Sequence, residues 1–331
     1  MVYTKLEGLN KKLSKMVFGT ATPQLFAAVA EGATAEDKEK AFKLLDDVFE
    51  AGINTFDCAS HYGEEIMGEW MQARGNREEC VIITKCAHPN KWRDRVTDFD
   101  ILSDIHDSLC KLKTDYVDVY MLHRDNPEMP VGAIVEVMNR LYYEGKVKLF
   151  GASNWTHKRI AEANEYAEEN NLIPFTVSSP NFGLAEQVSD PWVGDAKFGG
   201  GCVTIAGPEN KEAREWYAEN NIPVFAYSSL ARGFFSGAFR SSEPEKAKEI
   251  LDEPGYIGYF CENNLKRLAR CEELAEKKGI TVAQAAMAWI YNQKFEVFAL
   301  SSPVTAEQLK ANIEALEIEL TEEEVKWLNL E

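Results

Sequence analysis

The chain has 331 residues, of which 45% are hydrophobic and 27% charged, and its formal net charge is −18. This composition is typical of an ordinary soluble globular protein with enough apolar side chains for a sizeable core, and it excludes a disordered chain. The acidic balance argues against nucleic acid or an anionic membrane as the main partner.

The cysteines and the first residues of the chain bear on its compartment. There are seven cysteines, none of them spaced C-x-x-C, and the opening MVYTKLEGLNKKL lacks the apolar core of a signal peptide. No apolar run approaches the roughly 20 residues that span a bilayer. The sequence therefore predicts a cytoplasmic protein without a membrane-spanning segment.

Short apolar runs alternate with helical patterns from residue 15 onwards. Buried strands are predicted at 15–20, 53–56, 81–84, 118–122, 148–154, 175–179, 224–229 and 297–302. Helices are predicted at 35–51, 64–74, 100–112, 131–144, 158–170, 210–219, 282–291 and 306–316, with helical material at 243–278 and from residue 322. Thr281 is predicted to cap the helix that follows it.

Eight strands alternating with helices are typical of an α/β protein built as a (β/α)8 TIM barrel, with a doubly wound sheet as the alternative. Barrels of this length form single domains, so residues 1–331 are predicted to be one domain. Two connections, at 88–98 and 182–208, are longer than the fold needs. Loops of that length are usually functional, and we expect both at the carboxyl-terminal face of the strands.

Four titratable side chains stand at or near the ends of these apolar runs. Asp57 follows INTF, Lys85 follows VIIT and His123 follows DVYML, while Tyr62 lies five residues beyond Asp57. In a parallel barrel the carboxyl ends of the strands meet on one face, where such barrels do their chemistry. We therefore expect these four side chains to meet in one pocket.

Together these groups make a proton donor and a site for developing negative charge, with no metal required. A tyrosine is a poor acid at neutral pH, but the Lys85 ammonium would stabilise its phenolate. Asp57 would keep Lys85 charged, and a neutral His123 would donate a hydrogen bond to a carbonyl oxygen. The set lacks a hydride or an electrophile, which a bound nicotinamide would provide.

In the settings FDCASHYG, ITK and YMLHR, the four residues resemble the catalytic tetrad of the aldo-keto reductases. The resemblance runs from VFGTA at 17–21 to EQLKANIEAL at 307–316 and includes the motifs GASNW and FAYSSL. It implies hydride transfer between NADPH or NADH and an aldehyde or ketone. Tyr62 would be the general acid/base and His123 would orient the carbonyl.

The resemblance also implies contacts to the cofactor. Ser153 and Asn154 match positions that bind the nicotinamide carboxamide, and Tyr227 matches the ring that stacks on nicotinamide. Ser228 and Leu230 fall where the family wraps the pyrophosphate.

Four further positions bear on which cofactor is used. Ser179 stands where the family usually offers a glutamine to the carboxamide, and Asn312 matches an asparagine that contacts adenine. Ser302 and Gln308 stand where many NADPH-binding members have a lysine and an arginine for the 2′-phosphate. Without a bidentate arginine the 2′-phosphate loses a charge-assisted contact, so the cofactor is NADP or NAD.

Candidates for contact with a small carbonyl or alcohol substrate follow the same strands or lie in the long loops. They are His61, Trp92, Asp125, Trp155 and Phe182. The more polar residues near this face, His61, Trp92, Arg93, Asp125 and Asn126, favour a sugar or a small hydroxy-carbonyl compound.

Three alternatives remain open from the sequence. Lys85 could be the Schiff-base nucleophile of a lyase. His61, His123 and Asp57 could bind a metal for an isomerase or hydrolase. The chain could also be a non-catalytic nicotinamide-binding sensor or accessory subunit, although the intact tetrad argues against that.

Overall fold

The apolar runs predicted from the sequence form the strands of a closed barrel. A computed structural model describes residues 1–192 and 201–331 of the chain. Within them, eight parallel strands close in the order β10-β3-β4-β5-β6-β7-β8-β9. The (β/α)8 prediction is therefore confirmed. The chain forms two compact units, Met1–Ser178 with Ser302–Ala306, and Ser179–Ser301 with Glu307–Glu331. That residues 1–331 are one domain stays a prediction.

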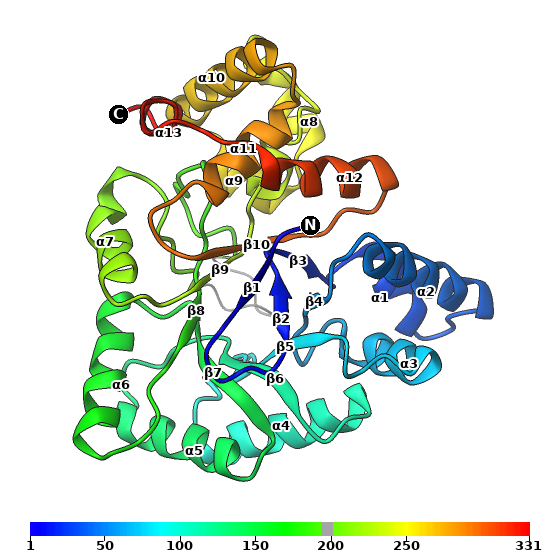
Figure 1. Cartoon of the computed structure of the whole chain (residues 1–331), viewed down its shortest axis with the longest axis vertical. Helices are drawn as coiled ribbons and strands as arrows, with labels where there is room; N and C mark the ends of the chain where they lie inside the picture. The colour runs from blue at the N-terminus through cyan, green and yellow to red at the C-terminus, as the bar shows by residue number, and fades with distance from the viewer. Residues whose placement is uncertain (193–200) are drawn as a thin grey trace. The chain divides into compact units, whose positions relative to one another are not determined.

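The first unit contains strands β1 to β7 and helices α1 to α6, and its outer helices follow the barrel strands in chain order (Figure 1). The strands are β1 Tyr3–Lys5, β2 Lys12–Ser14, β3 Met16–Gly19, β4 Thr55–Asp57, β5 Val81–Cys86, β6 Val117–Leu122 and β7 Val147–Ser153. The helices are α1 Pro23–Val29, α2 Ala35–Glu50, α3 Glu64–Arg74, α4 Asp98–Leu112, α5 Val131–Tyr143 and α6 His157–Glu169.

The second unit carries the remaining elements. Strand β8, Val177–Ser179, ends in it, and β9 Val224–Ala226 and β10 Val297–Ser301 follow. Its helices are α7 Lys211–Glu219, α8 Ala247–Ile250, α9 Glu253–Tyr259, α10 Glu262–Lys278, α11 Val282–Tyr291, α12 Ala306–Glu314, whose first residue belongs to the first unit, and α13 Glu322–Leu328. Residues 193–200 of the long connection predicted at 182–208 lie outside the described residues.

The barrel strands are buried, except for Lys148 in β7 and Ser301 in β10, because helices cover them. Every residue of β5 and β6 is buried, including the polar Thr84 and the charged Lys85 and Asp118. Strands of a parallel sheet covered in this way are expected to be continuous apolar runs. A charged side chain in such a run therefore needs a partner, which Lys85 has in the site described below.

Several helices begin at a threonine whose side chain accepts a hydrogen bond from the first turn. Thr281 accepts from the backbone of Gln284, whose side chain in turn accepts from the backbone of Thr281. Thr34 and Thr321 form the same reciprocal arrangement at α2 and α13. Such caps satisfy amide groups that have no partner inside the helix. The predicted cap at Thr281 is confirmed.

Two elements near the N-terminus were not predicted. Strands β1 and β2 form an antiparallel hairpin, held to the amino end of β4 because Ser14 N donates to Asn54 Oδ1 at 2.9 Å. Helix α1 begins at Pro23 with Thr22 as its N-cap. Among the described residues, no helix combines the length and the apolar character that crossing a membrane requires.

Candidate active site

Lys85 is the centre of a buried hydrogen-bonded group at the carboxyl ends of β4 and β5. Its Nζ donates to Asp57 Oδ1 at 2.6 Å, to the Tyr62 hydroxyl at 2.9 Å and to the Cys58 carbonyl at 2.9 Å. The Tyr62 hydroxyl also lies 3.1 Å from Asp57 Oδ2. Lys85 and Asp57 are both buried. The buried ammonium is therefore neutralised by the carboxylate and saturated by three acceptors.

The barrel fixes these side chains through its backbone. Asp57 is the last residue of β4 and pairs in register with Ile83, and Cys58 N donates to Ile83 O at 2.8 Å. Tyr62 follows in a tight turn in which Ala59 and Tyr62 exchange backbone hydrogen bonds. Because the turn is only a few residues long, it returns the tyrosine ring to the strand end that carries Asp57.

Gly63 permits this return. Its φ is +78°, in the region that favours glycine, and a Cβ there would lie 1.9 Å from Thr20 Oγ1. Thr20 Oγ1 in turn donates to the Asp57 carbonyl at 2.8 Å. Sequence reasoning missed both residues, although a glycine directly after Tyr62 is a signal of a tight turn.

Burial raises the pKa of the Tyr62 phenol well above its usual value near 10, and the Asp57 carboxylate acts in the same direction. The phenol therefore keeps its proton through the neutral range. The Lys85 ammonium at 2.9 Å is the group placed to stabilise the phenolate that remains once the proton has left.

His123 directly follows β6 and is held to β5, since its backbone N donates to Cys86 O at 2.8 Å. Burial lowers its pKa well below 6.5, and the positive charge of Lys85 adds to the effect. Its Nδ1 is buried without a hydrogen-bond partner among the described residues. His123 is thus a neutral imidazole, which can donate from one nitrogen only.

Two further histidines lie against His123. The ring centroid of His61 is 5.3 Å from that of His123, and that of His88 is 4.9 Å away. The His61 and His88 rings are 4.4 Å apart. Sequence reasoning placed His61 and His88 near the same face, and it grouped His61 with His123 and Asp57 as a possible metal site. The Asp57 carboxylate is bound by Lys85 instead, and His88 is the neighbour of His61.

The predicted carboxamide contacts lie at the end of β7 in the same unit. Asn154 is buried with a φ of +57°, and its Nδ2 donates to the His123 carbonyl at 3.1 Å and to Ser153 Oγ at 3.0 Å. The hydrogen bond to His123 places the ends of β6 and β7 side by side. A role of Ser153 and Asn154 toward nicotinamide stays a prediction.

In the second unit, the segment after β9 turns sharply. Positive φ angles occur at Ser228 (56°), Ala231 (49°), Arg232 (52°) and Gly233 (95°). The turn is held by its own backbone, since Ala231 N donates to Ser228 O at 2.7 Å and Gly233 N donates to Leu230 O at 3.1 Å. The predicted positions Ser228 and Leu230 lie in this turn, and Tyr227, directly before it, is partly exposed.

The four positions that bear on cofactor choice differ in what they already contact. Ser179 is buried and its Oγ donates to Phe225 O at 2.8 Å, so it could only accept a hydrogen bond from a carboxamide. Ser302 Oγ donates to Gly19 O at 2.8 Å. Asn312 Nδ2 donates to Ser301 Oγ at 2.8 Å, while Gln308 is exposed on α12.

The other substrate-pocket candidates differ in their exposure and in the side chains that they contact. The Asp125 carboxylate lies 3.3 Å from Arg159 Nε, so its charge is already paired. Trp155 is buried against Phe175. Trp92 is 78% exposed.

Phe182, in the second unit, is fully buried between Trp289 and Phe295. For Trp155, Phe182 and Asp125 these contacts favour a packing role. Contact with a substrate stays a prediction for all the pocket candidates.

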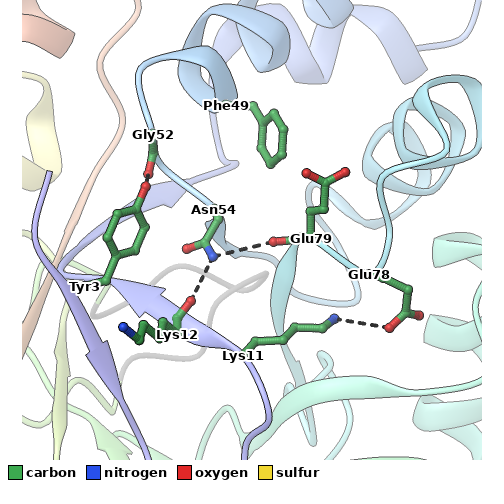
Figure 2. Close-up of a pocket in the computed structure, with 8 residues that line it drawn as sticks. All are labelled: Tyr3, Lys11, Lys12, Phe49, Gly52, Asn54, Glu78 and Glu79. Carbon is green, nitrogen blue, oxygen red and sulfur yellow. Dashed lines mark hydrogen bonds and ion pairs between the residues drawn. The ribbon is translucent and has the colours of Figure 1, made fainter.

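A surface hollow lies at the other end of the same strands (Figure 2). Asn54, which lines it, precedes β4, whereas Asp57 ends that strand. Two of the charged side chains in the hollow are paired, as Lys11 Nζ and Glu78 Oε2 are 4.0 Å apart. We therefore place the chemistry at the carboxyl ends of the strands and not in this hollow.

The closed parallel barrel, with polar groups gathered at its strand ends, places the chain among the barrel enzymes. The sequence profile of the Aldo/keto reductase family matches residues 15–329. The chain belongs to this family, as its motifs predicted. It is accordingly an NAD(P)H-dependent oxidoreductase that acts on aldehydes, ketones or the corresponding alcohols.

Characterised relatives match most of the chain at low identity. A norsolorinic acid reductase of Emericella nidulans is 28% identical over 87% of this chain and 70% of its own length. The aryl-alcohol dehydrogenase [NADP(+)] of Phanerodontia chrysosporium is 26% identical over 90% of this chain and 77% of its own. A crystal structure of a thermostable aldo-keto reductase with the inhibitor epalrestat shows the same fold, with a TM-score of 0.70. The match covers 100% of this chain and 99% of that chain, at 24% sequence identity.

Proposed function

We propose that the protein reduces an aldehyde or ketone with the hydride of NADPH or NADH, and that Tyr62 is the general acid. One observation carries the proposal. A single buried ammonium, Lys85 Nζ, contacts both the Tyr62 hydroxyl at 2.9 Å and the Asp57 carboxylate at 2.6 Å. An acid whose conjugate base is stabilised by a fixed cation is what carbonyl reduction requires.

Each side chain of the tetrad has one task in this proposal. A bound nicotinamide supplies the hydride. His123 donates a hydrogen bond to the carbonyl oxygen, because no described residue accepts from its buried Nδ1 and the proton is best placed on Nε2. Tyr62 passes its proton to the same oxygen as negative charge grows there. Lys85 then stabilises the phenolate, and Asp57 keeps Lys85 charged and in place. In alcohol oxidation the same steps run in reverse.

The residues present fit a dinucleotide. A pyrophosphate site at Ser228 and Leu230 is supported by the family match, and both residues lie in the tight turn after β9. The partly exposed ring of Tyr227 supports a stacking position beside it. A non-catalytic sensor role would need neither Lys85 nor Tyr62 in their hydrogen-bonded arrangement, so this arrangement favours catalysis.

For the substrate we propose a small aromatic aldehyde or ketone. Relatives of the chain are named as an aryl-alcohol dehydrogenase and a norsolorinic acid reductase. Around Tyr62, the imidazole rings of His61, His88 and His123 form flat surfaces that suit an aromatic ring. A sugar or small hydroxy-carbonyl is the second candidate, although its predicted acceptor, Asp125, is already bound by Arg159.

The test begins with titration of the purified protein by NADPH and NADH in turn, followed by tryptophan fluorescence. Turnover is then measured with benzaldehyde and with glyceraldehyde. We expect binding of at least one cofactor and faster turnover of benzaldehyde. If neither cofactor binds and borohydride traps a substrate adduct on Lys85, the lyase alternative replaces the proposal. The cytoplasmic location stays a prediction from the cysteine pattern.

A further inference from the structure

Three of the five histidines of the chain form one cluster. His61, His88 and His123 each place a ring nitrogen within 4.8 Å of the others. They come from the turn after β4, the loop after β5 and the end of β6, so separate elements bring them together. Nothing in carbonyl reduction by Tyr62 requires three imidazoles at this point.

The spacing is close to that of a metal centre. Three nitrogens that each bind zinc at 2.0–2.1 Å in a tetrahedron are about 3.3 Å from one another. The nitrogens must therefore close by up to about 1.5 Å from the separations of up to 4.8 Å seen here. His61 is exposed, and rotation of its side chain can supply most of this movement.

His88 is already oriented as a ligand. Its Nδ1 is 2.9 Å from the Pro89 carbonyl oxygen, which can only accept a hydrogen bond. The proton therefore lies on Nδ1, and Nε2 carries the lone pair. Metal-binding histidines commonly donate their second nitrogen to a backbone carbonyl in this way, which fixes both the tautomer and the ring.

The charges and the accessibility of the site also permit a cation. Two buried cations lie nearby: the Lys85 ammonium, which Asp57 neutralises at 2.6 Å, and Arg124, whose Nη1 donates to His123 O at 2.9 Å and whose charge a bound cation must tolerate. The exposed His61 provides an entry path from solvent. Imidazole ligands suit zinc, copper and nickel, while oxygen-preferring ions such as magnesium need carboxylates.

We propose that His61, His88 and His123 bind a divalent cation of the zinc class, and that the bound ion excludes a carbonyl substrate from Tyr62. The His61 ring lies 4.9 Å from the Tyr62 ring, so an ion held by the cluster occupies the space beside the phenol. His123 cannot orient a carbonyl while it ligates the ion. Free zinc would thus control the enzyme as a reversible inhibitor that competes with the carbonyl substrate.

The binding test uses Co²⁺ and Zn²⁺ on the full chain after chelator treatment. Co²⁺ gives visible absorption bands in a tetrahedral site, and thiolate ligands add a strong near-ultraviolet band that imidazoles do not. The spectrum therefore separates the histidine cluster from the seven cysteines. We expect one Co²⁺ per chain, without the thiolate band, displaced by Zn²⁺.

Zn²⁺ binding by single variants tests which histidines are the ligands. His88→Gln and His61→Asn should each weaken Zn²⁺ binding at least about tenfold, the usual effect of losing a ligand or its support. His106→Gln, an exposed histidine on α4, is the matched control and should bind as the unaltered protein does. NADPH binding by each variant checks that it is folded. If His88→Gln does not fold, His61→Asn still tests the site, because His61 is exposed and its replacement should not disturb the core.

The inhibition, unlike the binding, rests on the proposed function. Zn²⁺ should raise the KM for the aldehyde and leave kcat unchanged, and His88→Gln should remove this effect. Absence of stoichiometric binding, a thiolate band, or unchanged affinity in both folded variants would overturn the metal site. Binding without competition would keep the metal site and overturn the claim that it controls the enzyme. If aldehyde reduction fails altogether while Co²⁺ binds, only the proposed function is lost.

Discussion

The Lys85 ammonium lies 2.9 Å from the Tyr62 hydroxyl, although the two residues are 23 positions apart in the chain. The contact exists because β4 and β5 are parallel with Asp57 opposite Ile83 in register, and Lys85, two residues beyond Ile83, lies beside the turn that carries Tyr62. A phenol and an ammonium from two strand ends thus become one proton-transfer unit, anchored by the carboxylate of Asp57.

Replacing Tyr62 by phenylalanine removes the hydroxyl that is the proposed acid and keeps the aromatic ring. Tyr62→Phe should lower kcat for aldehyde reduction by at least about 100-fold, the usual contribution of a general acid. NADPH affinity should stay within a few-fold, as measured by tryptophan fluorescence. Tyr143→Phe, on a 69% exposed tyrosine, is the control and should behave as the unaltered protein. Near-normal kcat in Tyr62→Phe would remove Tyr62 from the acid role.

Replacing Lys85 by methionine tests the coupling through the pH profile. Without the ammonium the phenolate is less stable, so the pKa of Tyr62 rises further. Residual alcohol oxidation, which needs the phenolate, should therefore require a higher pH, whereas Lys43→Met on exposed α2 should not change the profile.

Lys85→Met should also lower stability. It leaves the buried Asp57 carboxylate without its cation, which typically costs about 3–5 kcal/mol. The drop in Tm is measured by calorimetry. An unshifted pH profile in a folded Lys85→Met protein would show that Lys85 does not tune Tyr62.

Two glycines at the ends of α3 provide a matched pair. Gly63 and Gly75 both have positive φ, +78° and +67°, but only at Gly63 would a Cβ meet another atom, Thr20 Oγ1, at 1.9 Å. Gly63→Ala should therefore displace Tyr62 and reduce kcat strongly. Gly75→Ala shares the backbone strain, costs about 1 kcal/mol of stability and should leave kcat unchanged. Equal kinetics for the two variants would contradict the positioning role of Gly63.

The connection at 88–98 is held by an ion pair between the exposed Arg93 and the buried Asp100, which gives stability a defined pH dependence. Arg93 donates to both Asp100 oxygens at 2.6 Å. This hydrogen bonding lowers the pKa of Asp100, so its contribution is fully present above about pH 4 and is lost as the pH falls through its lower, folded pKa.

Asp100→Asn should thus reduce stability by about 1.5–3 kcal/mol at pH 7. The Tm difference from the unaltered protein should shrink as the pH is lowered below about 4. Asp94→Asn, at an exposed position of the same connection, should show little change at either pH. A Tm difference independent of pH would mean that the carboxylate charge is not what holds the connection.

The absence of an arginine at Gln308 predicts a weak preference between the two cofactors. Gln308→Arg should lower the Kd for NADPH at least about tenfold, since a charge-assisted hydrogen bond contributes about 1.5–3 kcal/mol. The Kd for NADH, which has no 2′-phosphate, should stay the same. Gln308→Leu changes the side chain without adding charge and should not favour NADPH. Equal gains for both cofactors would place the 2′-phosphate away from α12.

The site residues that stand at strand ends could be predicted from the sequence. Asp57, Lys85 and His123 directly follow or end apolar runs, and fold geometry alone brings such positions to one face. Tyr62 was recognisable by its spacing from Asp57. The structure confirms that these residues lie together, while their roles stay proposals.

Contacts between separate loops could not be read from the sequence. His88 joins His61 and His123 only because three loops converge, and Arg159 reaches Asp125 from a helix 34 positions away. The hairpin β1–β2 escaped prediction because its strands have three residues each and no long apolar run. Helix α1 escaped although its Thr22–Pro23 start is a regular helix signal.

The hairpin has a practical consequence for handling the protein. Tyr3 donates from its hydroxyl to Gly52 O and Ser14 N donates to Asn54 Oδ1, so the hairpin sits where β4 begins, while Asp57 stands where that strand ends. A tether attached to the exposed Lys5 would therefore fasten the molecule by the side remote from Tyr62. Immobilised in this way on a sensor chip or a bead, the enzyme would keep its proton-transfer unit facing the flowing solution.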